Sequence, residues 1–226
     1  ENRMLVGHSK IMITNSSGVL HPDKKEFQEM VRESHFQGFP VAIHSVDMSS
    51  IDMILEVLKN DYLLGDRIEH ASELRDDQIV KMASLGISVS TQPSFIYERG
   101  DTYLSSQPAI DINSLYRINS LKKAGITVSA SSDSPVTYPD PMKTIYSAMT
   151  RKTKSGDVLN SKEAISALDS LKMLTTDSVT ISGLRNGSLQ DPKTLNEDSL
   201  VLETNLASGE TDNILGTKIS RVKDFK

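Results

Sequence analysis

The chain has 226 residues, of which 37% are hydrophobic and 24% charged, a composition that supports a packed core and argues against disorder. Its 25 Lys and Arg against 30 Asp and Glu give a net charge of -5, which argues against broad binding to nucleic acids or anionic membranes. It contains no cysteine, so disulfides, thiol nucleophiles and Cys-ligated zinc are excluded, and any metal must be held by His, Asp, Glu or a modified Lys.

A helix that ends at a glycine and is followed at once by a β-prone run recurs along the chain. Gly38, Gly86 and Gly125 each fit the left-handed position just past a helix end. Strands that alternate with helices of this size indicate βαβ units, and therefore an α/β fold with a parallel sheet. The predicted strands lie at about 9–14, 40–44, 66–70, 87–91 and 126–131.

Apolar residues at helical spacing predict the helices between these strands. In chain order, the expected helices begin near Asp23, cover residues 51–58, begin near Asp76, cover residues 115–123 and follow Asp140. Two more are expected at 162–170 and at 171–182. We expect residues 92–110 to form a long loop, in which Tyr97, Glu98, Arg99 and Tyr103 either line a pocket or are simply solvated.

The character of the chain changes after Gly187. Short β-prone runs at 199–202, 213–215 and 218–219 follow a polar segment at 190–198. We therefore expect a β/α domain at residues 1–186 and a β appendage at residues 187–226.

Neither a run of 18 apolar residues nor a basic-then-apolar signal peptide is present in the sequence. We therefore expect a cytoplasmic protein without membrane contacts. The first residue is Glu1 rather than Met, which predicts a processed, trimmed or partial polypeptide.

Three polar side chains stand at or just past the carboxyl ends of separate predicted strands. His44 and His70 close the second and third strands, and Asp133 follows the fifth. Carboxyl ends of parallel strands converge on one face where ligands bind, so two imidazoles and a carboxylate there could hold a divalent metal. A histidine at a strand end can also be a hydrogen-bonded loop residue, and Asp133 in Ser-Asp-Ser-Pro can also be a helix N-cap.

The motifs around these residues resemble the later strands of the amidohydrolase superfamily. The resemblance is strongest to amidohydrolase family 3, the group of N-substituted formamide deformylase and the AepA-like metal-dependent hydrolases. It rests on three motifs in family-like order and spacing, namely Val41-Ala-Ile-His44, Arg67-Ile-Glu-His70-Ala71 and Ser131-Ser-Asp133-Ser-Pro135. Further agreement comes from Ser90-Thr-Gln-Pro93, from Asp140-Pro-Met and from Gly187-Ser-Leu.

This resemblance implies a (β/α)8 TIM-type barrel with a β-sandwich appendage, of which the chain would supply strands four to eight and part of the sandwich. It implies that His44 and His70 are metal ligands and that Asp133 is both a ligand and the catalytic proton shuttle. Lys10 lies where the family often has a carboxylated lysine that bridges two metals, although a lysine at a strand start is usually just solvated. One or two divalent ions, with zinc expected, would then hydrolyse a C–N bond in a small amide-type substrate.

Several features depart from the family pattern. Loops that shape the substrate pocket carry Thr14-Asn15 and Ser45-Val-Asp47-Met48 in place of the family residues, so the substrate cannot be inferred from relatives. None of the five histidines forms the His-x-His pair of the superfamily's first strand, and five β/α units fall short of the eight in a barrel of about 250 residues. We therefore expect the C-terminal part of a longer enzyme, inactive by itself, that pairs with its missing N-terminal part or forms a homo-oligomer.

Two other functions remain open from the sequence. One is a metal-dependent hydrolase of another bond, such as a phosphoester or a lactone, on the same barrel. The other is a non-catalytic half-barrel that works as an interaction or regulatory module, which the missing His-x-His pair favours. The metal content of the full-length protein, together with an upstream reading frame that carries His-x-His, would separate them.

Overall fold

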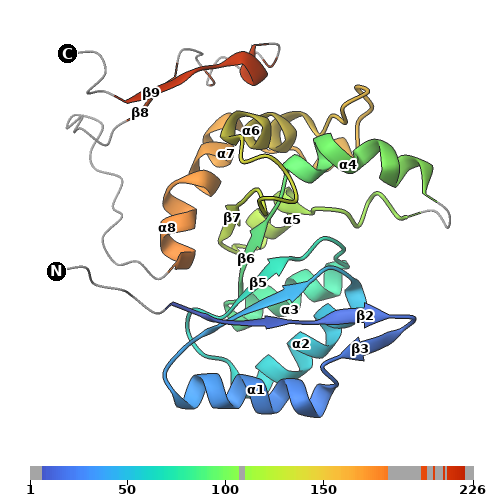
Figure 1. Cartoon of the computed structure of the whole chain (residues 1–226), viewed down its shortest axis with the longest axis vertical. Coiled ribbons are helices and arrows are strands. Elements are labelled where there is room, and N and C mark those ends of the chain that lie inside the picture. Colours follow the sequence, from blue (N-terminus) through green and yellow to red (C-terminus); the bar gives the residue numbers. More distant parts are fainter. Residues whose placement is uncertain are drawn as a thin grey trace.

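The computed structural model describes residues 7–106, 110–182, 200–202, 206, 211 and 213–221, and a five-stranded parallel sheet runs through it (Figure 1). The strand order is β1-β4-β5-β6-β7. The bounds are Ser9–Met12 for β1, Val41–Ser45 for β4, Arg67–His70 for β5, Ser88–Thr91 for β6 and Val128–Ala130 for β7. The predicted α/β fold with a parallel sheet is therefore confirmed, and every predicted strand position holds a strand of this sheet.

Helices connect the consecutive strands, and α1 and α2 lie side by side along the sheet (Figure 1). The described helices are α1 (Lys24–Phe36), α2 (Met48–Asp61), α3 (Asp76–Leu85), α4 (Ser94–Ser105), α5 (Ile118–Lys123), α6 (Pro141–Thr150), α7 (Ala167–Leu174) and α8 (Thr176–Ser182). The carboxylates of Asp23, Asp47 and Asp140 accept backbone N–H groups in the first turns of α1, α2 and α6, which explains why these helices begin there.

The expected long loop at 92–110 is wrong, because most of it is helix α4. Its apolar side chains Phe95 and Ile96 are buried in a small second core, and this burial stabilises a helix that sequence spacing did not reveal. Its polar side chains are engaged as well: Glu98 accepts a hydrogen bond from Lys143 at 2.5 Å, and the hydroxyl groups of Tyr103 and Tyr116 lie 2.9 Å apart. Tyr103 is therefore a packed side chain of a helix, and the exposed Glu98 is held by Lys143 on the surface of that helix rather than in a loop.

The chain between 161 and 182 also divides differently from the prediction. A short 3-10 turn, η1 (Ser161–Glu163), precedes α7, whose first turn is capped by the Ser166 side chain accepting from the Asp169 N–H group. The break before α8 falls at Thr175, so the second helix starts later than expected. Both α7 and α8 pack against β7.

A short hairpin, β2 (Thr14–Ser16) and β3 (Val19–His21), follows the first strand and was not predicted. Ser17 and Gly18 both have left-handed φ, 52° and 84°, as a tight hairpin turn requires. Asn15 donates to Asp47 and to Ser49 at the start of α2, and these bonds fix the hairpin against the loop that follows β4. The two loops that depart from the family pattern therefore contact each other.

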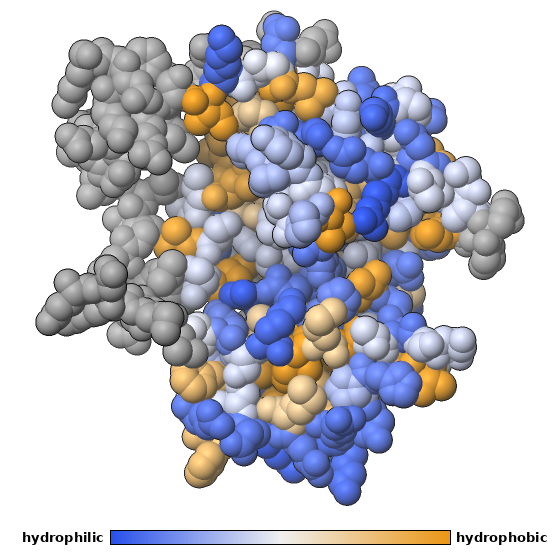
Figure 2. All heavy atoms as spheres, in the orientation of Figure 1, coloured by the Kyte–Doolittle hydropathy of each residue, from blue (hydrophilic) through white to orange (hydrophobic). Residues whose placement is uncertain are grey.

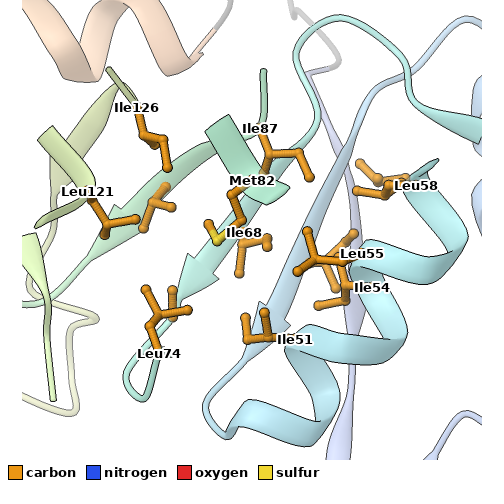
Figure 3. Close-up of a cluster of buried hydrophobic side chains, with 14 of the residues drawn as sticks. Ile51, Ile54, Leu55, Leu58, Ile68, Leu74, Met82, Ile87, Leu121 and Ile126 are labelled. Atoms are coloured by element: carbon orange, nitrogen blue, oxygen red, sulfur yellow. The ribbon is translucent and has the colours of Figure 1, made fainter. Parts of the chain in front are cut away.

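One face of the sheet is apolar and buried under helices. The paired residues Ile11, Ile43, Ile68, Val89 and Val128 form one row across all five strands of this face. Figure 3 shows Ile68 of this row near side chains of α2 and α3, among them Ile51 and Met82. This row, together with the helices over it, forms the main core of the molecule.

The opposite face of the sheet is polar. Its paired rows consist of Lys10, Ala42, Arg67 and Ser88, and of Met12, His44, Glu69, Ser90 and Ser129. Arg67 and Glu69 form an ion pair at 2.7 Å, and Met12 is 56% exposed. The candidate His44 thus belongs to the polar face of the sheet, which α8 approaches where Arg67 donates to the Ile181 carbonyl at 3.1 Å.

In the part of the appendage that the structure describes, β8 (Leu200–Leu202) pairs antiparallel with β9 (Ile219–Arg221). The expected run at 213–215 is instead largely a 3-10 turn, η3 (Ile214–Gly216), and Ile214 packs on Met142 and Ile145 of α6. The predicted boundary at residue 187 and the polar segment at 190–198 lie outside the described residues, so the division into two domains stays a prediction.

Figure 2 shows that hydrophilic residues cover much of one face of the molecule and that apolar residues form separate patches. Among the described helices, none combines the length and apolar character that crossing a bilayer requires.

Asp66, directly before β5, is fully buried and accepts three hydrogen bonds. Its carboxylate receives the backbone N–H groups of Val41 and Leu63, both at 2.9 Å, and lies 3.0 Å from Nε2 of His35. This one side chain therefore joins the starts of β4 and β5 to the end of α1.

We predict that Asp66→Ala lowers the free energy of unfolding by about 3 kcal/mol or more, because it leaves buried N–H groups without an acceptor. Urea denaturation measures the change. Glu29→Ala is the control, since its contact with Lys25 spans 4.0 Å between exposed side chains, and a loss below about 0.5 kcal/mol is expected. Equal effects of the two substitutions would contradict the anchoring role of Asp66.

Candidate functional site

The two strand-end histidines lie in contact. His44 is half-buried near the end of β4, and His70 closes β5 with 7% of its surface exposed. Their ring centroids are 4.4 Å apart, and the ring planes meet at 73°. Two adjacent imidazoles at the carboxyl ends of neighbouring strands are suited to binding a divalent ion of the zinc type.

The contact depends on an irregular backbone at the end of β5. His70 pairs with Ser45, so regular alternation would place its side chain on the face opposite to His44. His70 and Ala71 have φ values of 73° and 46°, in the left-handed region that non-glycine residues rarely adopt. This conformation takes His70 out of the strand pattern, and such strained residues cluster at functional sites.

Neighbouring backbone holds this turn in place. The Leu74 N–H group donates to the Ser114 carbonyl at 3.0 Å, and the Tyr116 N–H group donates to the Ser72 carbonyl at 2.8 Å. The residues just past His70 are therefore paired with the segment that precedes α5.

A buried guanidinium supports that segment from behind. Arg151 is fully buried and donates to the carbonyl groups of Leu115, Tyr116 and Leu159, each at 2.9 Å. Burial lowers the pKa of Arg151 to about 10, so the group remains charged at neutral pH. Arg151 could not be identified from the sequence, since a lone arginine in a loop gives no signal of burial.

A buried glutamine links His70 to the next two strands. Gln92 is 2% exposed, its Oε1 lies 2.7 Å from Nδ1 of His70, and its Nε2 donates to Oγ of Ser131 at 2.9 Å. The sequence showed Gln92 only inside the motif Ser90-Thr-Gln-Pro93. Its position directly after β6, close to the strand-end positions of the two histidines, was the signal that could have identified it.

Asp133 lies in an exposed turn after β7, with φ of 54°. Among the described residues, its carboxylate has no hydrogen bond and no ion pair. Its charge raises the pKa of His44, but burial, the His70 ring and Lys10 outweigh it and lower that pKa overall. The alternative role of Asp133 as a helix N-cap is wrong, since Asp140 caps the next helix.

Lys10 lies on β1 and shares the polar face with His44. It pairs with Ala42, two residues before the Met12–His44 pair, so strand alternation places it on the same side. Partial burial lowers the pKa of Lys10 and Arg67 lowers it further, while Glu69 and Asp133 oppose them. The structure thus brings Lys10 into the electrostatic neighbourhood of the site, and its bridging role stays a prediction.

Within the described residues, no three His, Asp or Glu side chains gather closely enough to hold a metal ion. His44 and His70 fit two positions of such a site by their donor chemistry and contact. Asp133 does not join them as a third ligand in this arrangement. The described chain therefore holds part of a donor set.

Comparison with known proteins gives consistent matches. A family model described as "Amidohydrolase family" matches residues 5–191. N-substituted formamide deformylase of Arthrobacter pascens is 28% identical over 183 residues, which cover 76% of this chain and 33% of that protein. Protein LONG AFTER FAR-RED 3 of Arabidopsis thaliana is 27% identical over 216 residues, which cover 90% of this chain and 36% of that protein. The chain thus spans about a third of the length of these curated relatives.

Among solved structures, the chain is similar to an uncharacterized metal-dependent hydrolase from Pyrococcus horikoshii OT3. The TM-score is 0.73 and the sequence identity 26%, over 84% of this chain and 43% of that one.

We predict that Arg151→Lys lowers the free energy of unfolding by about 2–4 kcal/mol, because one ammonium cannot reach three diverging carbonyl groups. Denaturation by urea measures it, with Arg32→Lys as the matched control. Arg32 pairs with Asp61 at the surface, where the same exchange should cost less than about 1 kcal/mol. An unchanged stability of Arg151→Lys would show that the three hydrogen bonds do not hold the segment.

Proposed function

The chain belongs to the amidohydrolase family, and on that premise we propose that it forms part of a metal-dependent hydrolase that cleaves a C–N bond in a small amide-type substrate. The observation that carries this proposal is the contact between His44 and His70 at the carboxyl ends of neighbouring parallel strands. The names of similar proteins, a formamide deformylase and a metal-dependent hydrolase, support the reaction class.

We propose that His44 and His70 bind one divalent ion, with zinc expected for two imidazole nitrogens. Asp133 and a carboxylated Lys10 would add oxygen donors, the latter as a bridge to a second ion, and further ligands would come from parts of the protein that the structure does not describe. When bound, the metal supplies a water molecule whose pKa is lowered to about 7. The lowered pKa of His44 keeps its imidazole neutral near neutral pH, as ligation requires.

Asp133 is assigned the proton transfer. Its exposed carboxylate has no hydrogen-bond partner in the described part of the chain, so it is free to take a proton from the attacking water. As the C–N bond breaks, the same proton passes to the leaving nitrogen. In the overall reaction, water adds across the C–N bond, and the Asp133 carboxylate returns to its ionised form.

We further propose that the five strands are strands four to eight of a (β/α)8 barrel. This is supported by the uniform parallel order and by β1 and β7, each of which pairs with only one neighbour in the described sheet. The coverage of less than half of the similar metal-dependent hydrolase agrees with it. Pairing with the remaining strands, or with a second copy of the chain, would satisfy the free N–H and C=O groups of these edges.

The lack of a third ligand beside His44 and His70 among the described residues favours one rival, a non-catalytic module that works by association. A full-length protein without bound metal and without turnover would establish that rival. A metal-loaded protein that cleaves esters or lactones but no amide-type bond would instead change the substrate class.

We predict that a polypeptide of these 226 residues alone shows no hydrolase turnover above background, because its described residues hold only part of a donor set. The assay uses a panel of formamide and amide substrates with added zinc. Robust metal-dependent turnover by this polypeptide would contradict the proposed division of the site.

In the full-length protein, Asp133→Asn should lower kcat by about 10²–10⁴-fold while metal content is retained, because the amide keeps a coordinating oxygen but cannot accept the proton. His70→Ala should lose metal and activity together. Metal stoichiometry and kcat/KM are measured side by side. Asp23→Asn, the same exchange at the N-cap of α1, is the control and should keep both. Near wild-type activity of Asp133→Asn would refute the shuttle.

A further inference from the structure

The contact between Gln92 and His70 carries a finer inference, which rests on the proposed function. Gln92 bridges Nδ1 of His70 and Oγ of Ser131, so one buried amide joins the ends of β5, β6 and β7. A ligating histidine needs a deprotonated nitrogen, and its other nitrogen usually has a hydrogen-bond partner that fixes the tautomer. The question is therefore which nitrogen of His70 carries the proton.

Two arrangements of the amide satisfy Ser131, since a hydroxyl group both donates and accepts. With Oε1 of Gln92 toward the ring, Nδ1 of His70 carries the proton and donates it. With the amide reversed, Gln92 would donate to Nδ1, and the proton of the neutral ring would sit on Nε2.

The position of the Gln92 side-chain oxygen favours the first arrangement. His70 is only 7% exposed, and in the described part of the chain its ring has no hydrogen bond except the one to Gln92. The structure places Oε1 of Gln92, the acceptor end of the amide, 2.7 Å from Nδ1, so Nδ1 carries the proton and Nε2 keeps a lone pair that no described protein group uses. The His44 ring makes an edge contact with His70 and no hydrogen bond.

We propose that Gln92 is a positioning residue that holds His70 as the Nδ1–H tautomer and so keeps the Nε2 lone pair for a divalent ion. The amide itself is held by Ser131, two residues before Asp133. Gln92 thus ties the orientation of the ring to the segment after β7 that carries the proposed proton shuttle.

The direct test is the ring tautomer of His70 in the metal-free, full-length protein, read by ¹⁵N–¹H correlation NMR on the neutral imidazole. The expected spectrum shows a protonated Nδ1 and an unprotonated Nε2. A wild-type ring protonated at Nε2 overturns the proposal, and this reading needs no variant.

Substitution tests the cause. Gln92→Met keeps the side-chain size but removes the acceptor, so the Nδ1–H preference should be lost and zinc affinity should fall by about 10–100-fold. Gln92→Glu keeps an acceptor and should retain the Nδ1–H tautomer. Gln78→Met is the matched control, because Gln78 is equally buried but bonds to Met48 and Asp52, away from His70. An unchanged tautomer and zinc affinity in Gln92→Met overturns the positioning role.

The tautomer reading separates this proposal from the proposed function. An Nδ1–H ring in a protein that binds no zinc supports the positioning by Gln92 and refutes the metal-dependent hydrolase. An Nε2–H ring in a zinc-loaded, active protein refutes the positioning and leaves the hydrolase standing.

Discussion

Parallel hydrogen bonding of the five strands is the constraint on which the candidate site depends. It aligns the carboxyl ends of the strands, so residues far apart in sequence, such as His44 and Gln92, end at one edge of the sheet. Alternation along each strand then separates an apolar face, covered by helices, from a polar face that carries His44 and Lys10. The helices supply the stability, and the polar face is left for chemistry.

The site departs from that regular frame at one point. His70 reaches His44 only because the backbone at His70 and Ala71 adopts left-handed φ values, which non-glycine residues pay for in strain. The surrounding structure offsets this strain with buried hydrogen bonds, both in the paired segment that Arg151 supports and between the His70 ring and the Gln92 side chain. A strained turn fixed from two sides gives a ring whose position is defined before any ligand binds.

Features that depend on interactions between residues close in sequence could be predicted, and features that depend on tertiary contacts could not. Helix spacing and the glycines before three of the strands are local signals, and they predicted the strand positions and the convergence of His44 with His70 at the carboxyl ends. The hairpin, helix α4 and the buried Arg151 depend on tertiary contacts, such as the burial of Phe95, that no local pattern announces. Gln92 was visible as a strand-end residue, but its bond to His70 depends on the left-handed turn, which the sequence did not reveal.

The central claim is that His44 and His70 bind one divalent ion. Anomalous scattering at the zinc absorption edge, from crystals of the full-length protein grown with zinc, tests it most directly. The account predicts an anomalous peak about 2.0–2.1 Å from one ring nitrogen of each histidine, with Nε2 as the nitrogen of His70. Bound zinc located elsewhere, with no peak between the two rings, would contradict it.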